Sequence, residues 1–147
     1  MSGDWIVNPG RLWAIGVTTS LVAAMAAGVV WLFATQVFDE TLLVAPPGGD
    51  LEELTVGMVL IVSFLIGVMA TGALHLLLAF VPRGDLFFGL IGTLILFLSF
   101  IPLAQLDGVT TANQLWLAGL HITVFLFVVP VLSGSVGRVA LRRVGTV

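Results

Sequence analysis

The stretch Leu115–Pro130, LWLAGLHITVFLFVVP, decides the fold of this chain. It lies in a run from Gly108 to Gly137 that contains no Asp, Glu, Lys or Arg, and His121 is the single histidine of that run. An uncharged apolar run of this length can cross a membrane as a helix, which takes about 20 residues. A titratable side chain is costly inside such a helix, so His121 is a candidate functional residue.

The composition indicates that the whole chain, and not only this stretch, belongs to a membrane protein. Of the 147 residues, 59% are hydrophobic and 9% are charged, whereas soluble domains average about 25% charged residues. We therefore predict a single integral membrane domain covering residues 1–147. Cysteine is absent, which excludes disulfides, zinc–thiolate sites and thiol catalysis. The net charge of −3 and the absence of a large basic cluster argue against nucleic acid as a partner.

Four uncharged runs predict four membrane-spanning helices, arranged as an all-α bundle with up-down topology. The expected spans cover about residues 12–37, 54–82, 86–106 and 114–137. A Pro-Pro-Gly-Gly cluster stops any helix in the loop after the first span. The connector 107–113 is short, so the third and fourth spans are expected to form an antiparallel helical hairpin.

The arginines predict the orientation of these spans. They stand near the amino end, between the second and third spans, and in the carboxyl-terminal tail, as Arg11, Arg83, Arg138, Arg142 and Arg143. Four spans place all of them on one side, which the positive-inside rule identifies as the cytoplasm. We therefore expect both termini in the cytoplasm. The loop 39–53 on the other side carries five acids, and we interpret it as a solvated exterior loop rather than a cation site.

Small residues repeat every four positions in the first span, at Gly16, Ser20, Ala24 and Gly28. This spacing lets two helix backbones approach closely in lipid. The partner helix could belong to the same chain or to a second copy in a dimer. We favour packing within the chain.

Two histidines fall inside the expected spans. From the rise of a helix, His75 lies roughly 10 Å and His121 roughly 24 Å from the cytoplasmic end, a difference in depth of about 14 Å. Because metal–nitrogen bonds are about 2 Å long, this difference disfavours one metal held by both rings within a subunit. Thr93 is expected near the depth of His75.

The third span offers partners for His121. Ser99 is expected at a similar depth, and Pro102 leaves the carbonyl of Leu98 without its usual helical donor. We therefore expect the His121 ring to turn toward the third span and to meet Ser99 or the Leu98 carbonyl. His121, Ser99, Pro102, His75 and Thr93 are the candidate ligand-binding or helix-clamping residues.

The functional prediction is a non-enzymatic membrane protein. The spans contain no carboxylate, although proton-coupled transporters usually carry them there, and the sequence has no hydrolase or phosphate-binding motif. We expect a bundle that binds lipid or a hydrophobic small molecule, or an accessory subunit of a larger membrane complex or homo-oligomer, without a metal or cofactor. Two alternatives remain open: a redox or pigment-binding subunit with His121 or His75 as a single axial ligand, and a small oligomeric transporter or channel subunit.

Two segments resemble a known family. LSFIPL at 98–103 and LWLAGLHITVFLFVVPVL at 115–132 are similar to the carboxyl half of a bacterial family of small four-helix membrane proteins, domain-of-unknown-function family 6069. The resemblance falls mainly on residues 86–137. It implies a multi-pass protein of the bacterial plasma membrane, and it singles out Ser99, Pro102, His121 and Pro130 without naming an activity.

Overall fold

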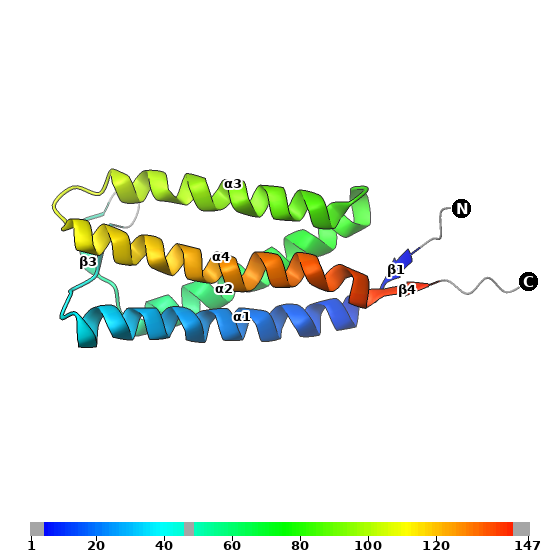
Figure 1. The fold of residues 1–147 in the computed structure, drawn as a ribbon, viewed down its shortest axis with the longest axis horizontal. Helices are drawn as coiled ribbons and strands as arrows, with labels where there is room; N and C mark the ends of the chain where they lie inside the picture. The colour runs from blue at the N-terminus through cyan, green and yellow to red at the C-terminus, as the bar shows by residue number, and fades with distance from the viewer. Residues whose placement is uncertain (1–4, 46–48, 143–147) are drawn as a thin grey trace, which may run out of the picture.

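The computed structural model describes residues 5–45 and 49–142, and four long helices dominate this part of the chain (Figure 1). They are α1 (Pro9–Leu32), continued by the π-helical segment η1 (Phe33–Val37), α2 (Val56–Phe80), α3 (Gly84–Ala104) and α4 (Thr111–Val139). Each is long and apolar enough to cross a membrane. The helix ends lie within three residues of the expected span limits, so the prediction of four apolar helices is confirmed.

Local capping residues set where the first two long helices begin. The Asn8 side chain accepts a hydrogen bond from the backbone N–H of Arg11 at 3.1 Å, and the next residue is a proline, which suits the first helical position. Thr55 caps α2 in the same way, accepting from the N–H of Met58 at 3.3 Å. Each cap satisfies a backbone donor that would otherwise lack a partner.

Helix α1 lies at the centre of the packing, against both α2 and α4. Helix α3 packs on α4 and makes a smaller contact with α2, so α3 is the most peripheral of the four helices (Figure 1). In the most apolar part of α3 only 6% of the residues are buried, against 39% in the first helix. The outer surface of α3 is therefore apolar and open to whatever surrounds the bundle.

Small residues make the contact between α1 and α2. A Cβ added to Gly16 would overlap the side chain of Thr71, and one added to Gly67 would lie 2.9 Å from the Cα of Ser20. Each helix therefore places a glycine opposite a hydroxyl residue of the other, and the backbones approach closely. All four members of the row in the first span are buried, which confirms its interpretation as packing within the chain.

The buried side chains form two apolar clusters along the bundle. One consists of Leu12, Ala23, Leu74, Phe88, Val128 and Leu132, and draws on all four helices. The other consists of Ala27, Ala34, Leu42, Val59, Leu117 and Leu120. Leu42 belongs to the loop after η1, so the second cluster extends the core beyond the helices.

Two short antiparallel strand pairs depart from the all-α expectation. Strand β1 (Trp5–Val7) pairs with β4 (Ala140–Arg142) at one end of the bundle, and β2 (Leu43–Val44) pairs with β3 (Glu52–Glu53) at the other (Figure 1). The pairs form where the helices end and the backbone N–H and C=O groups need new partners. They leave the helical architecture unchanged.

The loop between η1 and α2 is packed against the bundle, which corrects the expectation of a merely solvated loop. Leu42 is buried, and the indole N–H of Trp31 donates to the carbonyl of Leu54 at 2.6 Å. Asn113 at the start of α4 bonds to both backbone groups of Leu43. The acidic residues of this loop are exposed or half-buried.

The arginines of the described residues lie at one end of the bundle. Arg11, Arg83, Arg138 and Arg142 belong to the end that carries β1, β4 and the α2–α3 turn, which we call the arginine end (Figure 1). Arg143 is outside the described residues. The connectors at the opposite end carry Asp39, Glu40, Asp50, Glu52, Glu53 and Asp107.

Candidate functional site

His75 forms a polar contact that the sequence did not predict. The indole N–H of Trp13 on α1 donates to Nδ1 of His75 on α2 at 3.0 Å, and the two rings meet edge to face with centroids 6.4 Å apart. Because Nδ1 accepts this bond, the neutral ring carries its hydrogen on Nε2. His75 is half-buried, and with Trp13 it joins α1 to α2 near the arginine end.

His121 bonds to its own helix and not to α3. Its Nδ1 lies 2.8 Å from the carbonyl oxygen of Leu117, one turn earlier. The Ser99 hydroxyl donates to the carbonyl of Leu96 at 2.7 Å, also within its own helix. The expected contact of His121 with Ser99 or the Leu98 carbonyl is therefore wrong. A carbonyl one turn back on the same helix is already in place, and α3 need not approach to supply it.

The bond to Leu117 fixes the tautomer of His121. A carbonyl oxygen can only accept, so Nδ1 carries the hydrogen and Nε2 of the neutral ring presents a lone pair. The two histidines therefore differ in chemistry. Nε2 of His75 is a donor, whereas Nε2 of His121 is an acceptor or metal ligand. A histidine whose Nδ1–H is held by a backbone carbonyl has the orientation used by metal-ligating imidazoles.

His121 is exposed although it belongs to the inward stripe of α4. Residues three and four positions apart share one face of a helix, and this face includes Leu117, Val124, Val128 and Leu132. Those four side chains are buried or half-buried. An exposed imidazole on an otherwise apolar stripe is costly in lipid unless a partner bonds to its second nitrogen.

An open groove of about 530 Å³ lies between α3 and α4. Its walls are Asp85, Leu86, Gly89, Leu90 and Thr93 from α3 and Phe125, Val129, Pro130, Ser133 and Gly134 from α4. The Thr93 hydroxyl donates to the carbonyl of Gly89 at 2.8 Å, and the Ser133 hydroxyl donates to that of Pro130 at 3.3 Å. Glycines at positions 89 and 134 leave open space, since a Cβ there would meet nothing within 4 Å.

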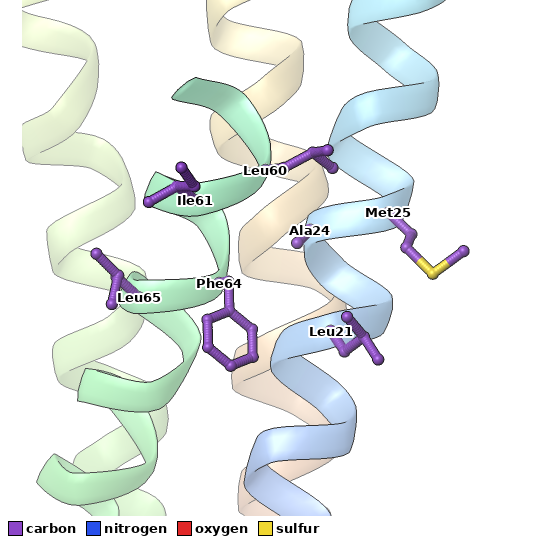
Figure 2. A pocket seen from close by; sticks show the side chains of 7 residues that line it. All are labelled: Leu21, Ala24, Met25, Leu60, Ile61, Phe64 and Leu65. Atoms are coloured by element: carbon purple, nitrogen blue, oxygen red, sulfur yellow. The ribbon is translucent and has the colours of Figure 1, made fainter. Parts of the chain in front are cut away.

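A second groove, of about 310 Å³, lies between α1 and α2. Figure 2 shows the seven side chains that line it, Leu21, Ala24, Met25, Leu60, Ile61, Phe64 and Leu65. All are apolar, and the small Ala24 lies between the longer side chains of the two helices. This groove can take an acyl chain but offers no side-chain hydrogen bond.

The candidate residues from the sequence do not gather at one place. Thr93 lines the α3–α4 groove, His75 pairs with Trp13, and Ser99 and His121 each bond to their own helix. Pro102 lies exposed near the end of α3. Within the described residues, no three His, Cys, Asp or Glu side chains come together as a metal site would require.

Sequence reasoning missed the partner of His75 and the role of Asp85. The depth estimate that places Thr93 near His75 also places Trp13 on the same side, and this is the signal that could have found the pair. Asp85 precedes the expected third span, 86–106. The half-buried residue stands in the first turn of α3 and lines the groove.

Comparison with known proteins identifies the family. The model of the Family of unknown function (DUF6069) matches residues 7–138. The chain belongs to this family. The match of this DUF6069 protein covers nearly the whole chain. It therefore extends well beyond residues 86–137, on which the resemblance rested. No curated protein and no solved structure matches the DUF6069 chain.

Proposed function

We propose that this DUF6069 protein crosses the plasma membrane four times, with both termini in the cytoplasm. The four apolar helices support the spans, and the position of Arg11, Arg83, Arg138 and Arg142 at one end supports the orientation through the positive-inside rule. The acidic connectors then face the exterior. The apolar outer surface of α3 faces lipid or a neighbouring membrane protein.

Within the membrane the protein binds a lipid or a hydrophobic small molecule and carries out no chemistry on it. The α3–α4 groove carries this proposal. It is open along the bundle, its walls are mostly apolar, and its lining residues include Asp85, Thr93 and Ser133. Ligand sites are typically apolar concavities with a few polar groups that fix orientation. The same groove suits an accessory subunit that presents a bound lipid to a larger complex.

A groove-filling variant tests this function. Gly89→Leu puts a large side chain into the open space of the groove and should lower the amount of lipid or other hydrophobic ligand retained in native mass spectra of protein released from membranes. Gly119→Leu is the matched control. Gly119 lies on α4 outside the groove, a Cβ there also meets nothing within 4 Å, and its carbonyl likewise accepts from a threonine one turn later. Equal retention by both variants and the wild type would remove the proposal.

A second candidate function is that of a subunit with a metal-bearing pigment on a single histidine. The observation that favours it is the exposed His121 side chain, whose ring is oriented by the Nδ1 bond to Leu117. His75 is the poorer ligand, because its Nδ1 already accepts from Trp13. The visible absorption spectrum of protein purified from its native membrane tests whether a pigment is bound. A pigment band should be lost in His121→Leu and kept in His75→Leu, and a colourless protein would exclude this function.

The transporter or channel alternative receives little support from the hydroxyl groups. Thr18, Thr93 and Ser99 each donate to a carbonyl of their own helix, so their hydrogens are not free to bond a permeating anion. Ion flux into liposomes above that of empty vesicles would revive this alternative.

A further inference from the structure

The polarity of the α3–α4 groove changes along its length. Asp85 is the one charged residue among the ten that line it, and it is half-buried in the first turn of α3. Ser133 lines the same end from the carboxyl-terminal part of α4. Further along, toward the middle of the bundle, the walls are formed by Leu90, Thr93 and Phe125. The groove therefore has a polar end at the arginine end and a mainly apolar remainder.

This polarity matches the direction of a lipid molecule in a bilayer. From Asp85 to Thr93 the groove follows eight residues of α3, about 12 Å at 1.5 Å per residue. A phospholipid in the leaflet on the arginine side places its headgroup at the interface and its acyl chains toward the middle. The headgroup then lies at the polar end of the groove, and the acyl chains lie along its apolar part.

The charges at the polar end select the headgroup. The carboxylate of Asp85 attracts a cation and repels phosphate. Arg83 precedes it by two residues in the tight turn, is exposed, and supplies a guanidinium that suits phosphate. A primary ammonium has three N–H donors and can bond to a carboxylate and a hydroxyl together, whereas a trimethylammonium group has no N–H donor. A zwitterionic headgroup with a primary ammonium fits both residues.

We propose that the α3–α4 groove binds an ethanolamine phospholipid. The ammonium bonds to Asp85, the phosphate lies toward Arg83, and one acyl chain follows the groove past Leu90 and Phe125. This inference rests on the proposed lipid-binding function and names the class of lipid.

The experiment is native mass spectrometry of the purified full chain incubated with an equimolar mixture of phosphatidylethanolamine, phosphatidylcholine and phosphatidylglycerol that share the same acyl chains. A hydrogen bond to a charged group supports a preference of about tenfold for the ethanolamine lipid. Asp85→Asn should abolish this preference and Asp85→Glu should keep it. Asp107→Asn is the matched control, because Asp107 is an exposed acid at the opposite end.

A change in the lipid gives a test that does not depend on a variant folding. Stepwise N-methylation of the ethanolamine headgroup removes N–H donors one at a time, and retention by the wild type should fall with each methyl group. Equal retention of the mono-, di- and trimethylated lipids with the parent overturns the inference, as does an unchanged preference in Asp85→Asn.

Two further outcomes separate this inference from the function on which it rests. If Gly89→Leu loses all three lipids equally and the wild type shows no preference, lipid binding stands and the ethanolamine assignment fails. If Gly89→Leu keeps the lipids, the groove is not the site and both fail. Lower thermal stability of Asp85→Asn with unchanged lipid retention would assign Asp85 a structural role and overturn the inference.

Discussion

At the scale of single residues, hydrogen-bond partners distinguish two histidines that look alike in sequence. His75 accepts a bond from another helix, whereas His121 donates one to its own. The first bond therefore contributes to helix association, and the second mainly sets the direction of a ring. Replacing His75 should therefore lower the stability of the fold, whereas replacing His121 should affect the binding of a ligand.

The Trp13–His75 bond is the first place to test this distinction. Trp13→Phe keeps an aromatic ring but removes the N–H donor, and interhelical hydrogen bonds in membranes average about 0.6 kcal/mol with a maximum of about 1.7 kcal/mol. We expect a loss of this size in the free energy of unfolding in detergent. A double-mutant cycle with His75→Leu should give a coupling energy of the same size, and a coupling of zero would contradict the bond.

His121→Leu is expected to leave stability nearly unchanged. The lost bond lies within one helix, and leucine is a better helix former than histidine. The change in unfolding free energy should stay below about 1 kcal/mol, measured by the same detergent titration. A much larger loss would mean that the His121 ring holds α4 to another helix, as the sequence alone suggested.

The sequence identified both histidines but could not supply their partners. Depth across the membrane is predicted by counting residues, which assigns His75 and His121 to different levels. The direction in which a side chain points around its helix does not follow from depth. Ser99 and His121 share a level, yet each finds a carbonyl one turn back on its own helix.

At the scale of elements, the close α1–α2 contact depends on glycines, which have no side chain. Gly67→Ala places a Cβ 2.9 Å from the backbone of Ser20, so the helices must move apart. Overpacking of this kind typically costs about 1–3 kcal/mol. Gly119→Ala, in open space on α4, should instead be neutral or slightly stabilising because alanine favours helices. Thermal unfolding of the two variants in one detergent compares them directly, and equal midpoints would argue against close α1–α2 packing.

The loop after η1 depends on Asn113, which is 1% exposed. Its Oδ1 accepts from the N–H of Leu43 at 2.7 Å and its Nδ2 donates to the carbonyl of Leu43 at 3.1 Å. Asn113→Ala leaves both backbone groups without these partners, which costs about 1–3 kcal/mol for each buried group left unpaired. Hydrogen exchange at Leu43 should become faster, while Gln114→Ala, which removes one long bond of 3.4 Å, should have little effect.

The elements themselves were predictable, whereas their connections across the sequence were not. A long uncharged run in lipid satisfies its own backbone as a helix, so the four apolar helices follow from hydropathy. Asn113 and Leu43 are 70 positions apart, and nothing local to either residue indicates the other. The loop could therefore be predicted as a connector between two helices, but its packing against the bundle could not.

At the scale of the whole molecule, the arginine end carries the proposed orientation of the protein in the membrane. The arginines of three separate segments lie at the same end because the antiparallel helices return the chain to it, where β1, the α2–α3 turn and β4 are found (Figure 1). A chain with three or five spans would divide these arginines between the two sides. The span count and the orientation therefore rest on the same observation and can be tested together.

Single-cysteine labelling tests the orientation without background, because the natural chain has no cysteine. Gly49→Cys lies in the exposed part of the acidic loop and should react with a membrane-impermeant maleimide in intact cells. Val144→Cys, in the tail outside the described residues, should react only after the cells are opened. Pro82→Cys, exposed in the α2–α3 turn, is the control within the described structure and should behave like Val144→Cys. The positive-inside rule requires this pattern, since it keeps arginine-rich connectors from crossing the membrane. Reaction of Gly49→Cys and Pro82→Cys from the same side would mean that α2 does not cross the bilayer. If Pro82→Cys and Val144→Cys react in intact cells and Gly49→Cys does not, the four spans stand but the termini are outside.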